Sequence, residues 1–97
     1  MNLNAKNRRY LRSLAHSLKP VVMIGQSGLT NGVIEEINLA LEHHELIKVK
    51  IGIGDPGERS DMTSRICGAT QSVQVQNIGK MAIIYRPSIE PTIKLHP

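Results

Sequence analysis

The sequence predicts an α+β fold, arranged as a two-layer α/β sandwich in the order α-β-α-β-α-β-β. Two short apolar runs, at 21–24 and 45–53, are each followed by a glycine-containing turn and a stretch with helical apolar spacing. Two further strand-like runs, separated by Asn77-Ile78-Gly79-Lys80, predict a closing hairpin. Because strands joined through a helix run parallel and hairpin strands run antiparallel, the four-stranded sheet should be mixed, with the helices packed against it.

Length and composition indicate a single folded domain over residues 1–97. With 40% hydrophobic and 21% charged residues, the chain can bury a core of its own. Cys67 is the only cysteine, which excludes an internal disulfide and fits a reducing compartment. The sequence has no signal-peptide pattern and no apolar run near the ~20 residues of a membrane span, so a soluble, cytoplasmic protein is expected.

A first helix is expected from a cap at Asn4 to about Leu18. Its apolar stripe has the spacing of a helix with one buried face: Leu11, Leu14, Ala15 and Leu18. The rest of the helix surface carries four cations and no acid: Lys6, Arg8, Arg9 and Arg12. Surface helices usually mix both charge signs, so this face is interpreted as a surface that contacts phosphates.

The turn between the first strand and the second helix reads Gly25-Gln26-Ser27-Gly28, a GxxG pattern. Thr30 follows it in the position of an N-cap, and a helix is expected over Asn31–His44. Free backbone N–H groups and the helix dipole at such a place favour a bound phosphate. An ordinary tight turn would have the same pattern, so these residues alone leave both interpretations open.

The rest of the chain is expected to complete the sheet and to add a third helix. The strand at 45–53 alternates between a core face and an outer face that carries Lys48 and Lys50; its core-facing residues are Ile47, Val49, Ile51 and Ile53. A helix over 58–70 should turn Met62, Ile66 and Ala69 inward, and strands follow over Val73–Ile78 and Met81–Tyr85. The three prolines in 87–97 predict an extended, poorly ordered tail.

No cofactor, metal or catalytic site is expected. Residues 52–57 match the GxGxxG pattern of dinucleotide-binding folds, but Pro56 removes an amide donor and nearby acids would repel a pyrophosphate. His43 and His44 end a helix, and no further Cys or His has ligand spacing with them. No base is placed by the sequence to activate Cys67 or a serine, so the chain is not expected to be an enzyme or to take a small-molecule substrate.

Charge is distributed unevenly along a chain that is +4 overall. Residues 1–34 carry five Lys or Arg and no acid, whereas residues 35–61 carry seven Asp or Glu against three Lys or Arg. A polarised basic surface suits a polyanion such as nucleic acid, and a basic protein-interaction module for an acidic protein partner is the alternative. Two tyrosines without Phe or Trp cannot build a base-stacking platform, so RNA binding would rest on phosphate contacts and weaken steeply with salt.

Three motifs carry a family resemblance: LKPVVMIGQSGLT at 18–30, ELIKVKI at 45–51 and Tyr85-Arg86-Pro87. Together they resemble the YhbY family, the bacterial single-domain form of the CRM (chloroplast RNA splicing and ribosome maturation) domain. The resemblance covers nearly the whole chain. It implies a fold like the C-terminal domain of translation initiation factor 3. It also implies RNA binding without catalysis, with rRNA of large-ribosomal-subunit precursors as the partner.

The resemblance places the RNA contacts on the first helix, the GxxG turn and nearby cations. Many family members carry Lys or Arg in the middle of this turn, where the chain has Gln26 and Ser27, so more of the charge must come from the helix. The acidic segment 55–61 is expected to stay away from RNA. The residues expected to contact RNA are Lys6, Arg8, Arg9, Arg12, Lys19, Gly25, Gln26, Ser27, Gly28, Lys80 and Arg86.

Overall fold

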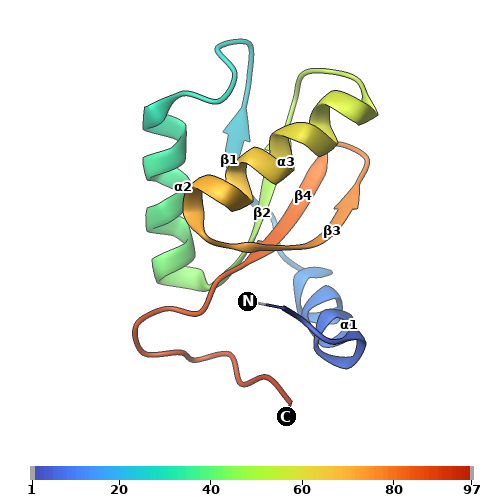
Figure 1. Ribbon diagram of the computed structural model, residues 1–97, viewed down its shortest axis with the longest axis vertical. Coiled ribbons are helices and arrows are strands. Elements are labelled where there is room, and N and C mark those ends of the chain that lie inside the picture. The colour runs from blue at the N-terminus through green and yellow to red at the C-terminus, as the bar shows by residue number, and fades with distance from the viewer. Residues whose placement is uncertain (1, 97) are drawn as a thin grey trace.

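Three helices and four strands follow one another in the predicted order. The computed structural model describes residues 2–96, so residue 97 of the expected tail lies outside the described residues. The elements are α1 (Ala5–Ala15), β1 (Pro20–Ile24), α2 (Asn31–His44), β2 (Leu46–Ile51), α3 (Pro56–Thr70), β3 (Val73–Ile78) and β4 (Met81–Tyr85), as Figure 1 shows. The predicted α+β fold is confirmed.

The four strands form one mixed sheet in the order β1-β2-β4-β3. β1 runs parallel to β2, while β2 with β4 and β3 with β4 are antiparallel pairs. β1 and β3 are therefore the two edge strands. Each has an irregularity in its pairing, in β1 between Pro20 and Val22 and in β3 between Gln74 and Gln76.

The main core lies between one face of the sheet and the helices α2 and α3. Its buried side chains include Ile37 and Leu41 of α2, Ile66 of α3, and Val49 and Ile84 of the sheet. Ile47, Val49 and Ile51 are all on this face, as the alternation of the sequence predicts.

The first helix packs on the opposite face of the sheet and covers only part of it. Leu11 and Ala15 of α1 are fully buried against Leu46, Ile83 and Tyr85. α1 contacts β2 and β3, at the end of the sheet where β2 begins (Figure 1). A second, smaller core results, and the sheet face beyond α1 stays partly open, with Met23 of β1 63% exposed.

Side-chain caps begin all three helices. Asn4 Oδ1 accepts a hydrogen bond from Asn7 N (2.8 Å), and Thr30 Oγ1 accepts one from Val33 N (3.2 Å). Asp55 and Glu58 form a reciprocal capping box, which begins α3 at Pro56, two residues earlier than predicted.

The end of α1 and the buried stripe of α3 differ from expectation. α1 ends at Ala15 because tight turn bonds follow, from His16 N to Ser13 O and from Leu18 N to Ala15 O. In α3 the prediction that Ala69 points inward is wrong: Ala69 is exposed, and Thr63 and Thr70 are buried with Ile66. Both threonine hydroxyls donate to carbonyls one turn earlier in the helix, which makes their burial tolerable.

The expectation of a poorly ordered tail is also wrong for the described residues. The segment 86–96 has no helix or strand, but it crosses below the sheet and returns to the start of α1 (Figure 1). Ile93 and Leu95 pack against the second core, and Asn7 and His96 exchange two hydrogen bonds of 2.8 and 2.7 Å. The prolines made the tail extended, but its order comes from contacts with distant residues.

Glu45 is the centre of those contacts. It ends α2 with a positive φ of 65°, and its side chain is 1% exposed. Its carboxylate accepts five hydrogen bonds from the tail: two each from Ser88 and Thr92 and one from Ile93 N, all between 2.8 and 3.0 Å. Burial acts to raise the pKa of this carboxyl, but the combined hydrogen bonds outweigh it and lower the pKa to about 2. The tail is therefore anchored on a buried charge.

Candidate nucleic-acid interface

The solvent side of α1 presents a group of cations without acidic neighbours. Leu11 and Ala15 face the sheet, which leaves Lys6, Arg9 and Arg12 exposed, and Lys19 is exposed just before β1. We call these four residues the α1 cations. Within residues 2–96 the ion pair found is between Arg86 and Glu42, so the α1 cations are not neutralised by a carboxylate there. Such a surface attracts phosphate from solution.

Arg8 lies on the same helix but is used differently. It is half-buried, and its guanidinium donates to the backbone carbonyls of Gln74 and Val75 in β3. These carbonyls lie where the β3 pairing is irregular. Arg8 therefore holds α1 against the sheet edge.

The GxxG turn follows β1 at the other end of that strand. Gly28 N donates to Gly25 O (2.9 Å), which closes the turn, and Gly28 has a φ of +71°. Gly25, Gln26 and Ser27 are exposed, and a Cβ on either glycine would meet no atom within 4 Å. Glycine is thus required at position 28 for backbone conformation and leaves open space above the turn, where a ligand backbone can approach.

α1 precedes β1 and the GxxG turn follows it, and Figure 1 shows the helix and the turn at opposite ends of this strand. Six residue steps of extended chain from Lys19 to Gly25 correspond to about 20 Å. The sequence predicts that the cations and the turn belong to one site. In the structure they are two separate places that only an extended ligand can touch together.

Lys80 lies at the same end of the sheet as the GxxG turn, whereas Arg86 does not. Ile51 N donates to Lys80 O (2.7 Å) and Gly52 N to Ile24 O (2.8 Å), so the β3–β4 turn and the GxxG turn lie at one end of the sheet. Arg86 lies at the other end of β4, where its guanidinium binds Asn38, the carbonyl of Thr70 and Glu42. Arg86 ties α2 and α3 to the start of the tail.

The acidic start of α3 lies at the same end of the sheet as the GxxG turn. It follows β2 directly through residues 52–55 (Figure 1). The Asp55 carboxylate accepts a hydrogen bond from Glu58 N (2.8 Å), and the Glu58 carboxylate accepts one from Asp55 N (3.1 Å). That this segment stays away from RNA remains a prediction, and its charge opposes anion binding from the α3 side of the turn.

Two lysines that are not among the residues expected to contact RNA lie between the two places. Lys48 and Lys50 point to the face of the sheet opposite α2 and α3, and both are half-buried. Lys50 is paired with Met23 and Met81, and Lys48 Nζ donates to the carbonyl of Leu18 (2.9 Å). The alternation of β2 was the available signal, because it placed both lysines opposite the core.

Metal-ligating side chains do not cluster among residues 2–96. No group of three His, Cys, Asp or Glu side chains there could hold a metal ion. Burial raises the pKa of the Cys67 thiol, against a smaller lowering by a hydrogen bond with Ser72, so this thiol is not activated as a nucleophile. In the same described part of the chain, no helix has the length and apolar character needed to cross a membrane.

Known proteins resemble this chain over nearly its full length. A protein of Haemophilus influenzae, named RNA-binding protein, is 47% identical over 93 residues, covering 96% of this chain and 94% of that one. A protein of Pseudomonas aeruginosa, named as a probable RNA-binding protein, is 39% identical and covers 98% of this chain and 91% of its own.

A protein from Staphylococcus aureus has a solution structure that matches with a TM-score of 0.85 and 38% identity, over 98% of this chain and 100% of that one. The family model described as the CRS1/YhbY (CRM) domain matches residues 3–86. That range holds every helix and strand of the fold, including α1 and the GxxG turn. The chain belongs to the CRS1/YhbY (CRM) domain family.

Proposed function

We propose that this protein binds RNA through phosphate contacts and catalyses no reaction. The observation that carries the proposal is the exposed set of α1 cations: Lys6, Arg9, Arg12 and Lys19, with no carboxylate paired to them among the described residues. The names of the relatives support RNA as the polyanion. Almost no exposed aromatic surface is available, so phosphates and not stacked bases supply most of the affinity.

In this proposal the RNA runs from the α1 cations along the open sheet face to the GxxG turn. The α1 cations hold one stretch of backbone, and Lys80 with the exposed residues of the GxxG turn holds a second stretch about 20 Å away. Lys50 lies between them. Arg8 and Arg86 are assigned positioning roles, because their guanidinium groups bind carbonyl and amide oxygens of the protein itself.

The RNA we propose is rRNA of large-ribosomal-subunit precursors, which the family resemblance implies. Two attachment places about 20 Å apart suit a structured RNA better than a short single strand, because they require two backbone segments held in fixed relation. The proposed role is that of an assembly factor that holds such a structure.

The test measures affinity for a large-subunit rRNA fragment by fluorescence anisotropy at several salt concentrations. Arg12→Glu should weaken binding and reduce the slope of log K against log salt by about 1 or more. Arg65→Glu is the matched control, since Arg65 is an exposed arginine on α3. Equal effects of the two variants would show that only net charge matters. Binding partners that survive nuclease treatment would favour an acidic protein partner instead.

A further inference from the structure

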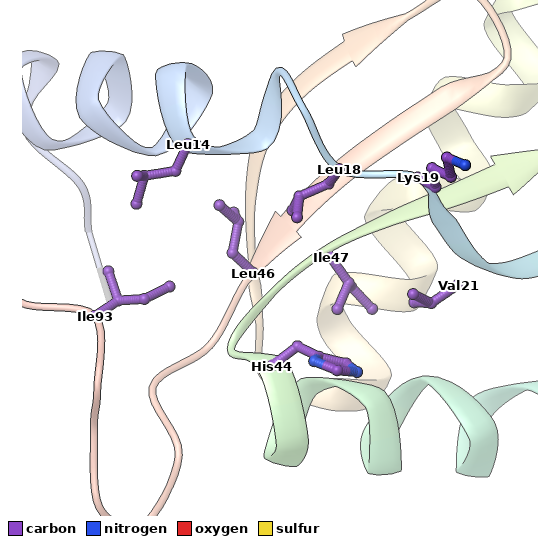
Figure 2. Close-up of a pocket in the computed structure, with 8 residues that line it drawn as sticks. All are labelled: Leu14, Leu18, Lys19, Val21, His44, Leu46, Ile47 and Ile93. Atoms are coloured by element: carbon purple, nitrogen blue, oxygen red, sulfur yellow. The ribbon is translucent and has the colours of Figure 1, made fainter.

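An apolar pocket lies beside the α1 cations, at the start of the sheet. Its volume is about 470 Å³, within the range of small-ligand sites. Figure 2 shows the lining side chains, which come from α1, the turn after it, β1, the last turn of α2, β2 and the tail. The apolar ones are Leu14, Leu18, Val21, Leu46, Ile47 and Ile93, and the polar ones are Lys19 and His44.

The pocket uses Leu14 of α1 and Leu18 of the turn after it, the two residues of the predicted apolar stripe that the core leaves uncovered. Leu11 and Ala15 are fully buried, but Leu14 and Leu18 are 36% and 37% exposed, and Val21 beside them is 45% exposed. Apolar side chains gathered around a concavity, and not scattered singly, mark a place where another molecule can bind.

The walls are fixed before any ligand arrives. Ile93 N donates to the Glu45 carboxylate (2.8 Å), which holds the tail side of the pocket in place. On the other side, Lys48 Nζ binds the carbonyl of Leu18 (2.9 Å) and fixes the turn after α1. A preformed pocket loses little conformational entropy on binding.

The charge around the pocket restricts its occupant. No acidic side chain lines it, and its polar groups are the ammonium of Lys19 and the imidazole of His44. Lys19 is at once a wall of the pocket and one of the α1 cations. A ligand that fits has an apolar, flat body, hydrogen-bond acceptors at its edge and a negative charge attached to it. An unpaired nucleotide has all three properties.

We propose that this pocket takes one unstacked nucleobase of the RNA held by the α1 cations, with an adjacent phosphate on Lys19. The inference rests on the proposed RNA binding and adds to it a preference for RNA that carries an unpaired nucleotide beside a helix. The aliphatic walls contact the faces of the base, His44 meets its polar edge, and Lys19 holds the adjacent phosphate. A fully paired helix offers no base to this pocket.

The experiment compares two RNA hairpins with the same stem, one of them carrying a single bulged 2-aminopurine. The full-length protein should bind the bulged hairpin on the order of tenfold more tightly, and the 2-aminopurine fluorescence should change on binding. Replacing Leu14→Ala and Leu18→Ala together should bring the affinity ratio close to one and remove most of the fluorescence change. The salt slope should stay as in the wild type, because no charge has changed.

The control variant is Leu39→Ala, which shortens a leucine that is 63% exposed on α2 and outside the pocket. It should keep the preference for the bulged hairpin. Equal wild-type affinity for both hairpins, with steep salt dependence, would overturn the pocket proposal and leave the proposed function standing. Failure to bind either hairpin at any salt would refute both. Binding of an acidic, leucine-containing peptide in the pocket, together with no fluorescence response to the bulged RNA, would assign the pocket to a protein partner and overturn the proposal.

Discussion

Removing the charge of Glu45 should destabilise the protein by an amount that depends on pH. The pKa of the Glu45 carboxyl falls from its ordinary value of 4.5 to about 2 in the folded protein. At ~1.4 kcal/mol for each pKa unit, this lowering corresponds to about 3 kcal/mol of stability at neutral pH. The physical source is the set of five hydrogen bonds that the charged oxygens accept from the tail.

The sign follows from the direction of the pKa change. A carboxyl with a lower pKa in the folded state stabilises the fold above its unfolded pKa and loses that contribution as the pH falls through the folded value. The contribution should therefore be complete above about pH 5.5, fall to about 1.4 kcal/mol at pH 3 and vanish below about pH 1.

The assay is urea unfolding of the wild type and of Glu45→Gln at pH 7 and pH 3. The amide also places a donor where Ser88 or Thr92 already donates, so the loss at pH 7 should be about 3 kcal/mol or more. The difference between the two proteins should shrink by about 2 kcal/mol on going to pH 3. Glu42→Gln is the control: its side chain is 43% exposed and accepts one tail hydrogen bond, so its effect should stay below about 1 kcal/mol. A Glu45→Gln difference that is the same at both pH values would refute the reasoning.

Two further pairs of variants test the interface. Gly28→Ala should cost about 1 kcal/mol in urea unfolding because the φ of Gly28 is +71°, whereas Gly25→Ala, which has free space and no positive φ, should cost much less; equal losses would contradict the conformational argument. Arg8→Ala should lower the urea midpoint because it removes the contacts of α1 with the β3 carbonyls, while Arg9→Ala should leave stability unchanged and weaken RNA binding. Indistinguishable stabilities of the two arginine variants would show that Arg8 does not hold α1 in place.

The fold was predictable because its signals are local. The alternation of Ile47, Val49 and Ile51 gave the buried face of β2, and Thr30 marked the start of α2. In α3 the apolar spacing was too sparse for the same reasoning. Thr63 and Thr70 are buried where Ala69 was expected to be. Their burial is tolerated because each hydroxyl donates a hydrogen bond to a backbone carbonyl of the same helix.

The parts that sequence reasoning missed depend on contacts between distant residues. Glu45 bonds to tail residues 43 to 48 positions away, and Arg8 reaches carbonyls 66 and 67 positions away. Helical spacing places Arg8 nearer than Arg9 to the buried Leu11, but nothing local predicts that Arg8 reaches the carbonyls of β3. The pocket is likewise formed by six parts of the chain. Its only sign in the sequence is that the predicted apolar stripe of the first helix is longer than the small core beneath it needs.

The hydrogen bonds between Asn7 and His96 bear on how the protein folds while it is being synthesised. They join residues 89 positions apart, and α1 otherwise depends on β2, β3 and β4, which are made long after it. Contacts of such long sequence separation form late, because the loop between them must close first. The cationic helix is therefore synthesised before the strands on which it packs, and it docks only after they have been made. Until β3 and β4 have been made, Leu11 stays uncovered and the cations of α1 are not held in a fixed arrangement.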